Sequence, residues 1–480
     1  MAYLHGVRVQ ENPTSLPAPV TSEAGVPIVI GTAPVNLAAN PAKAVNVPIL
    51  CKTYAEAVAA LGYSEDYEKY TLCQAMDAFF KSFAVGPVVF INVLDPATHK
   101  TAITAETLPV NDGIATSDTL GIIMSSVIVK NGEDALVIDE DYTLAFDEDG
   151  KLVITVLASG VTSVILTGDK LNPAGVTATT IIGSYDATTG ACTGIECVTL
   201  VYPKFNRFPS LILAPGWSQN AAVALALAAK CENLSGSFRA ECVVDLPATS
   251  GGAIVYSNVK TVKDSLGFND RHMIVCWPEV LVDGKQMYMS AMWAALAIYT
   301  DIGNDDVPAL YPSNKLLRIT GSVLHDGTEV NLDQGQAGEV NGYGVVTVLN
   351  ANGYKAWGNN MAGYPENTDP KDRWIGCRRF FSWWGNRFIV TYLEKVDDPA
   401  NKRLIESIVD SENVRGNALV SAGKCAGIRT VYDPQDNPIA NILNGKIVFR
   451  QYLAPYTPAE DILDILEYDV SMIEAELGGE

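Results

Sequence analysis

Short, fully apolar runs recur along the first two-thirds of the chain, with amphipathic segments between them. Val26–Pro34 (VPIVIGTAP) and Val88–Leu94 (VVFINVL) are typical of strands buried on both faces of a sheet. The segment between them carries apolar residues at helical spacing: Leu72, Met76, Phe79, Phe80 and Phe83. Strands that alternate with helices predict an α/β domain with a largely parallel sheet.

Polar residues mark where these helices are expected to begin. Thr53 with Glu56, and Thr71 with Gln74, have the spacing of a capping box, in which both side chains satisfy free backbone amides. Ser218 is placed to cap a later helix in the same way. We therefore expect hydroxyl caps at all three helix starts.

From residue 99 to 199 the pattern changes to short β-like runs separated by turns. Aromatic residues become rare, and turn signals such as Asn131-Gly132 and Asn172-Pro173 divide the runs. This predicts an all-β insertion, a sandwich, which splits the α/β domain into residues 26–98 and 200–335.

The last third of the chain combines two predicted strands, a dense aromatic segment and an amphipathic helix. Gly344–Asn350 (GVVTVLN) and Lys446–Ala454 (KIVFRQYLA) predict the strands. The helix is predicted to begin at Pro399, with an apolar stripe on one face and an outward set of charges: Lys402, Arg403, Glu406 and Asp410.

Both ends of the chain carry strand-like segments with no partner nearby in the sequence. Gly6–Glu11 is a short alternating segment, and the prolines after it favour an extended arm over residues 1–25. Leu466–Met472 alternates apolar and polar residues with period two. A strand without an adjacent return strand has to pair with something distant, so this segment is expected to reach a remote sheet.

Composition narrows the possible functions. A length of 480 residues with 48% hydrophobic and 18% charged residues predicts two to four well-packed domains. The net charge of −22 argues against binding to nucleic acid or to an anionic membrane, because such contacts need clustered Lys and Arg. We expect no membrane span and no signal sequence, since the start of the chain lacks an apolar region and the helical apolar runs are short.

Motifs for catalysis, cofactors and metals are missing from the sequence. The nine cysteines form no CxxC pair, which predicts reduced thiols and leaves an intersubunit disulfide open. The four histidines are dispersed, so we expect no metal site, and the sequence contains no P-loop, HExxH or Gly-x-Ser-x-Gly motif. His272 begins a predicted strand and is interpreted as structural. We expect no cofactor and no enzyme activity.

An ordered series of segments in the last third resembles a known family. The segments are GVVTVLN, YKAWGNN, DRWIGCRRFFSWW, DDPANKRLIESI, NGKIVFRQYLAPYTPAEDI and ILEYDVSM. Together they resemble the conserved C-terminal region of tail sheath proteins of contractile bacteriophage tails and related contractile injection systems. One departure is visible, because the family often has Arg-Thr soon after Trp-Gly, where this chain has Asn359-Asn360.

The resemblance implies a domain plan and two kinds of contact. The fold would be α/β and α+β multidomain, with a split subtilisin-like α/β domain, the β-sandwich insertion, a conserved α+β C-terminal domain over 336–460 and a C-terminal arm over 461–480. The two arms would exchange strands between subunits through these residues: Val7, Val9, Leu466, Tyr468, Val470 and Met472. The charges Lys402, Arg403, Glu406 and Asp410 would face the tail tube.

The implied function is a structural subunit that polymerises around a tail tube and contracts to drive it through a cell envelope. Its partners would be further copies in stacked hexameric discs, the tail tube protein, and the baseplate and tail terminator proteins. It would be assembled in the host cytoplasm and belong to the virion. The alternatives are the sheath of a headless bacteriocin or of an extracellular injection system, and a hydrolase on the subtilisin-like scaffold. A type VI secretion sheath fits less well, because it divides the work between two chains.

Overall fold

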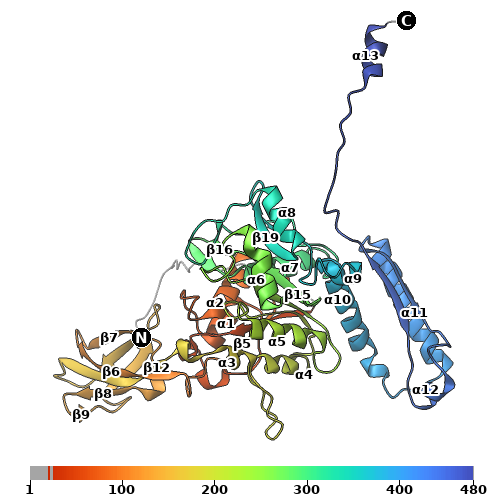
Figure 1. Ribbon diagram of the computed structural model, residues 1–480. Coiled ribbons are helices and arrows are strands. Elements are labelled where there is room, and N and C mark those ends of the chain that lie inside the picture. The colour runs from red at the N-terminus through yellow and green to blue at the C-terminus, as the bar shows by residue number, and fades with distance from the viewer. Residues whose placement is uncertain (1–19, 22–24, 479–480) are drawn as a thin grey trace, which may run out of the picture.

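An eight-stranded, mostly parallel sheet forms the centre of the molecule. The structure is a computed structural model that describes residues 20–21 and 25–478 (Figure 1). The sheet order is β20-β19-β15-β14-β13-β2-β5-β3, and only the two edge strands, β20 and β3, run antiparallel to their neighbours. The bounds are β2 Val26–Gly31, β3 Ile49–Cys51, β5 Val88–Asn92, β13 Pro209–Leu213, β14 Glu241–Asp245, β15 Met273–Cys276, β19 Val345–Asn350 and β20 Tyr354–Trp357.

Helices cover this sheet and close a large apolar core. They are α1 Tyr54–Leu61, α2 Thr71–Met76, which continues as a π-helical turn over Asp77–Ser82, α5 Ala221–Glu232, α6 Val259–Leu266, α7 Met289–Ile302 and α8 Gln334–Gly342. Helix α7 is apolar nearly all round and is buried over most of its length. A small sheet of β17 (Lys285–Met287), β16 (Glu279–Val282) and β18 (Gly321–Val323) lies beside the core, and β1 (Val20–Thr21) pairs with β4 (Val85–Gly86).

One of the three expected hydroxyl caps is present. The Thr53 hydroxyl accepts a hydrogen bond from the amide of Glu56, as predicted. Thr71 instead binds the amide of Thr32, so its hydroxyl links two elements rather than capping α2. Asn220 caps α5 in place of Ser218, which is buried with its hydroxyl near Asp245. The two wrong caps share a cause, because burial gave each hydroxyl a tertiary partner.

The segment after β5 forms a separate antiparallel unit with a core of its own. Its strands are β6 Lys100–Pro109, β7 Ile114–Leu120, β8 Ile128–Asn131, β9 Asp134–Ala135, β10 Tyr142–Phe146, β11 Lys151–Val156 and β12 Ser163–Leu171. They make two sheets, β10-β11-β7 and β6-β12-β8-β9 (Figure 1, lower left). The unit is shorter than the expected 99–199, because α3 (Ala178–Ile182) and the 3-10 helix Gly194–Leu200 pack on the main core, as does the following α4 (Val201–Phe205).

The chain after residue 369 leaves the main body as a projecting C-terminal unit. It contains α9 Pro370–Arg373, α10 Ile375–Tyr392, α11 Lys402–Ser421, β21 Cys425–Val431, α12 Ile439–Leu443 and β22 Arg450–Pro455 (Figure 1). The boundary expected at residue 336 is too early, because β19 and β20 extend the central sheet. The helix predicted from Pro399 begins at Lys402, since Asn401 caps it, and the predicted Lys446–Ala454 strand begins at Arg450.

Two further observations complete the description. All nine cysteines are free thiols, and eight of them are buried. Among the described residues, no helix is both long enough and apolar enough to cross a membrane.

Candidate assembly surfaces

The segment after β22 extends away from the body and leaves its apolar side chains uncovered (Figure 1). Residues 456–469 have no regular secondary structure, and α13 (Val470–Leu477) follows. Leu466 is 88% exposed, Tyr468 is 78% exposed and Met472 is 69% exposed. Apolar side chains at such exposure are stabilised only when another surface covers them. We call residues 456–478 the C-terminal arm.

The arm departs from the predicted strand in its last part. Leu466 to Asp469 is unpaired, and Val470 and Met472 belong to α13, which Asp469 caps by accepting from the amide of Ser471 at 2.9 Å. A lone segment has no strand partner for its amides, whereas a helix satisfies them internally. Val7 and Val9 lie outside the described residues.

The C-terminal unit carries an open strand edge. β21 and β22 form a two-stranded antiparallel sheet, α11 packs against β21, and β22 has no second strand neighbour among the described residues. The side chains of β22 alternate between exposed and half-buried. Two-stranded sheets are marginal alone, and an open edge is a template for a further strand.

An aromatic groove runs between α10 and the β22 segment. Its volume is about 420 Å³, and its lining includes Phe381, Trp384, Phe388, Val448, Phe449 and Leu453. The indole nitrogen of Trp384 donates to the side-chain oxygen of Gln451, which ties α10 to β22. The sequence suggested dense packing here, but it did not reveal that part of the aromatic surface lines an open groove.

Buried ion pairs fix the first half of α10 to the body. Arg379 and Asp301, at the end of α7, are both almost fully buried and are joined by two hydrogen bonds. Burial raises the pKa of Asp301, and the Arg379 guanidinium opposes that effect. A buried pair of this kind holds geometry strongly, because removing one partner leaves an uncompensated charge.

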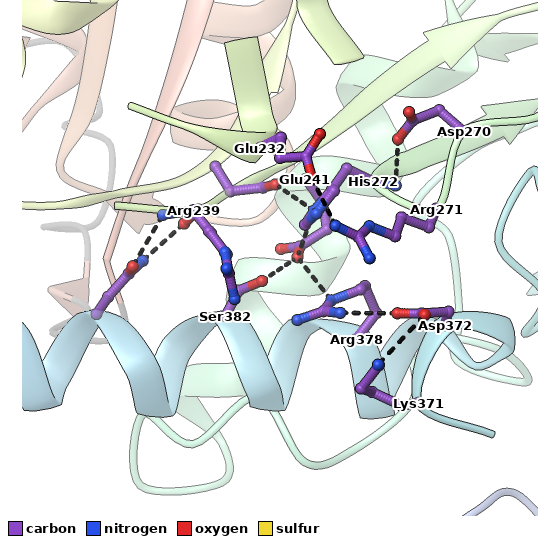
Figure 2. Close-up of polar contacts among 12 residues, drawn as sticks. Glu232, Arg239, Glu241, Asp270, Arg271, His272, Lys371, Asp372, Arg378 and Ser382 are labelled. Atoms are coloured by element: carbon purple, nitrogen blue, oxygen red, sulfur yellow. Dashed lines mark hydrogen bonds and ion pairs between the residues drawn. The ribbon is translucent and has the colours of Figure 1, made fainter. Parts of the chain in front are cut away.

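A second buried network joins α10 to the start of β14 (Figure 2). Ser382 donates to Glu241 at 2.6 Å, and Arg378 lies 3.9 Å from Glu241 while donating to Asp372 at 2.8 Å. Burial tends to raise the pKa of Glu241, but His272, Arg378 and Ser382 together lower it. Glu241 is therefore a buried carboxylate that anchors the helix.

His272 belongs to this same network. Its Nδ1 lies 3.1 Å from the carbonyl oxygen of Ala240 and 3.7 Å from the Glu241 carboxylate. It is buried beneath α10 and packs as a structural residue (Figure 2). An arginine pair inside an otherwise aromatic helix was the sequence signal for such buried acidic partners.

The four residues expected to face a tube lie together on an exposed surface of α11. Lys402, Glu406 and Asp410 follow one another at intervals of four residues, and Arg403 is their neighbour. Lys402 and Glu406 form an ion pair at 3.4 Å, and both side chains are exposed to solvent. The structure thus presents these charges outward on the projecting unit.

The serines closest to a catalytic arrangement serve a different purpose. The hydroxyls of Ser218 and Ser290 both donate to the buried carboxylate of Asp245. Ser290 is at the start of α7, and its backbone amide also donates to this carboxylate at 2.8 Å. A serine hydrolase needs a histidine between the carboxylate and the nucleophile. Here the hydroxyls donate directly to the acid, so the cluster ties α7 to β14. Among the described residues, no group of three His, Cys, Asp or Glu side chains could hold a metal ion.

This chain is similar in sequence and in fold to known proteins. The chain is 25% identical over 472 residues to the tail sheath protein of Burkholderia phage BcepMu, which covers 94% of both chains. The fold matches a chain of the anti-feeding prophage baseplate, at a TM-score of 0.60 and 16% identity, covering 98% of this chain and 100% of that one. It also matches the contracted sheath complex of the extracellular contractile injection system PVC, at 0.55 and 15% identity, covering 98% and 99%. No protein-family model matches the sequence.

The projecting unit, the uncovered arm and these near-full-length relatives define a structural assembly subunit and not an enzyme. More particularly, the chain is similar over nearly its whole length to tail sheath proteins of contractile phages, and its fold is that of chains from contractile injection systems.

Proposed function

We propose that this chain polymerises as stacked hexameric discs around a tail tube, and that the polymer contracts to drive the tube through a target cell envelope. The observation that carries the proposal is the C-terminal arm, which leaves the body with its apolar residues uncovered. In a polymer each arm would reach a neighbouring subunit, where those side chains become buried. Assembly then gains the apolar burial that the single chain lacks.

The open edge of β22 is the acceptor we propose for the arm of a neighbouring copy. An added strand there would gain main-chain hydrogen bonds, and its alternate side chains would enter the aromatic groove beside α10. In an extended segment every second side chain lies on the same face of the strand. The residues on the face that would enter the groove are Leu466, Tyr468, Val470 and Met472. Val7 and Val9 of the N-terminal arm are proposed to add a strand in the same way.

The buried anchors of α10 support a mechanical role for the projecting unit. Arg378, Arg379 and Ser382 fix the helix to the body, so a force on the unit is transmitted to the body without rearranging the core. The part of the arm after residue 460, which has no described hydrogen bond or ion pair to the body, can change direction while the body stays rigid. Such a lattice could alter its pitch and remain linked.

The energy for contraction is proposed to come from subunit contacts. A lattice that switches between two states is driven only by a difference in contact free energy between them. No nucleotide is required, and the sequence contains no P-loop. A baseplate would trigger the change, and a tail terminator would cap the polymer.

The exposed charges on α11 are the contact we propose with the tube. Lys402, Arg403, Glu406 and Asp410 are solvent-exposed in the single chain. Exposed ion pairs are individually weak, about 0–1 kcal/mol each, so a contact made of them can be released during contraction. We propose no contact with nucleic acid or membrane.

The domain plan is also part of the proposal. The parallel sheet, interrupted between β5 and β13, supports a subtilisin-like α/β domain split by a sandwich-type insertion. The projecting unit would be the conserved sheath domain. The complete particle would be a virion assembled in the host cytoplasm. The similarity of fold to the anti-feeding prophage and PVC chains supports the alternative of an extracellular injection system.

Deletion of residues 462–480 tests the central claim. The truncated protein should fold like the full chain, because the structure gives these residues no hydrogen bond or ion pair to the body within its described range. It should nevertheless form no tubes. Circular dichroism would check the fold, and negative-stain microscopy would check polymerisation. Long tubes of the truncated protein would show that the arm is not the link between subunits.

A further inference from the structure

A cleft with both polar and apolar walls lies where the C-terminal arm leaves the body. Its volume is about 620 Å³, and it lies between the end of α8, the segment 357–360 and the first arm residues, Pro458 to Glu460. The Asn359-Asn360 pair, at which the sequence departs from the sheath resemblance, lies in its wall. The cleft is thus partly formed by the arm itself.

Arg373 is held in a fixed orientation inside this cleft. Its guanidinium stacks at 4.2 Å from the ring centre of Tyr364 and at 3.9 Å from that of Trp374. Its Nε donates to the side-chain oxygen of Asn360 at 2.9 Å. An arginine fixed on two rings and an amide presents its remaining N–H groups in one direction.

Glu460 of the arm lies opposite this guanidinium. Its Oε2 lies 3.6 Å from Nη2 of Arg373, and its Oε1 accepts from Nδ2 of Asn359 at 3.3 Å. Asn359 is itself more than nine-tenths buried, so its side chain cannot follow a moving arm. The carboxylate is therefore held by one hydrogen bond, from Asn359, and by one ion pair, with Arg373.

Glu460 is also the last residue of the arm that the body holds. Before it, the hydroxyl of Tyr311 donates to the carbonyl oxygen of Tyr456 at 3.0 Å. After it, no hydrogen bond or ion pair joins residues 461–478 to the rest of the described chain. The boundary between fixed and free arm therefore falls at one side chain.

We propose that Glu460, gripped by Arg373 and Asn359, is a positioning residue that sets the direction in which the arm leaves the subunit. This inference rests on the proposed strand exchange. A directed arm has a higher effective concentration at the neighbouring edge than one that pivots freely at its root. Loss of the grip should therefore slow assembly without changing the fold.

Glu460→Ala is the test variant, and Asp461→Ala is its matched control. The two residues are adjacent, lose the same charge and differ in that Asp461 has no described bond to the body. Glu460→Gln has one acceptor oxygen and no charge, so it keeps at most the hydrogen bond from Asn359 and should give an intermediate result. The thermal unfolding temperature should be the same in all of these proteins, because the contacts of Glu460 with Arg373 and Asn359 lie outside the core.

The grip itself is measured on single subunits. Spin labels at Glu339→Cys on α8 and Asp464→Cys on the arm, in a Cys192→Ser background, report the spread of distances between body and arm. The distribution of distances should be narrow in the labelled protein that keeps Glu460 and in the labelled Asp461→Ala variant. It should be broad in the labelled Glu460→Ala variant. An unchanged distribution in Glu460→Ala would overturn the proposal.

Assembly rate gives the second readout, on unlabelled protein. Glu460→Ala should form tubes about three- to tenfold more slowly than the wild type and the Asp461→Ala control. If Glu460→Ala broadened the distance distribution but still assembled at the normal rate, the proposal would also be overturned. The proposed strand exchange would not be affected by that result. If the protein lacking residues 462–480 formed tubes, the strand exchange itself would fail.

Discussion

Single residues decide how the body of this protein is held together. Arg379 and Asp301 are 78 positions apart in the sequence, and Ser382 and Glu241 are 141 apart, yet each pair meets in the core. In these two pairs each buried polar group has its partner from another element, which is the condition for tolerating it inside. The helix that carries the projecting unit is fixed by these few contacts.

The buried carboxyl group of Asp245 makes the stability of the fold depend on pH. Burial raises its pKa to about 7 despite hydrogen bonds from Ser290 and Ser218, and the charge on Glu279 adds to the rise. A folded pKa above the unfolded value of 3.8 means that the folded state binds the extra proton. This group therefore stabilises the fold below pH 4, and that contribution is lost as the pH rises to 7.

The substitution Asp245→Asn removes the titration and keeps the shape. The free energy of unfolding of the wild type should fall relative to that of the variant between pH 5 and pH 7, by up to about 4 kcal/mol over the full range from pH 4 to pH 7. Chemical denaturation at several pH values measures it. Parallel pH curves for the two proteins would contradict the assignment.

Elements show how the same residues can suit two structures. Val470 and Met472 fit a strand by their alternation, and in the single chain they lie in α13. The helix forms because Asp469 caps it and because no strand is available to pair with. In the proposed polymer, an open β22 edge on a neighbour would supply that pairing, and the period-two pattern would then fit the arm.

Leu466→Lys tests whether the alternation has this meaning. Placing a charge on the face that would enter the aromatic groove should reduce tube formation by more than about tenfold, since a buried unpaired charge is costly. Glu467→Gln changes the net charge by the same amount on the opposite face and should assemble normally. Sedimentation of assembled tubes compares them. Equal assembly of both variants would exclude the proposed register.

The whole molecule has three parts with different tasks. The parallel-sheet body is the rigid centre, the antiparallel unit packs around its own small core, and the C-terminal unit projects with the arm and the charged surface of α11 (Figure 1). The antiparallel unit has a core separate from that of the body, whereas the base of the C-terminal unit packs into the core of the body.

Charge reversal on α11 tests the outward role of the projecting unit. The variant Lys402→Glu with Arg403→Glu should bind the tube roughly tenfold more weakly at low salt, because two favourable contacts become repulsive. Assembly without a tube should not change. Lys69→Glu, which disrupts an exposed ion pair on the body, is the control. Cosedimentation with tube protein measures binding, and an unchanged affinity would place the tube contact elsewhere.

The sequence alone determined the elements whose signal is local. Strands β2, β5 and β19 were evident from their apolar runs, the Thr53 cap from its spacing, and the outward charges of α11 from helical periodicity. The change of pattern near residue 99 also marked the separate antiparallel unit. These features depend on neighbours within a few positions, so the order of residues contains them.

Tertiary structure decided everything that depends on distant partners. Thr71 and Ser218 became tertiary contacts rather than caps, β19 and β20 joined the central sheet, and residues 173–199 returned to the main core. The grip of Arg373 and Asn359 on Glu460 joins residues about a hundred positions apart. Such contacts arise from burial and from the geometry of packed elements, and a linear pattern cannot specify which distant groups will meet.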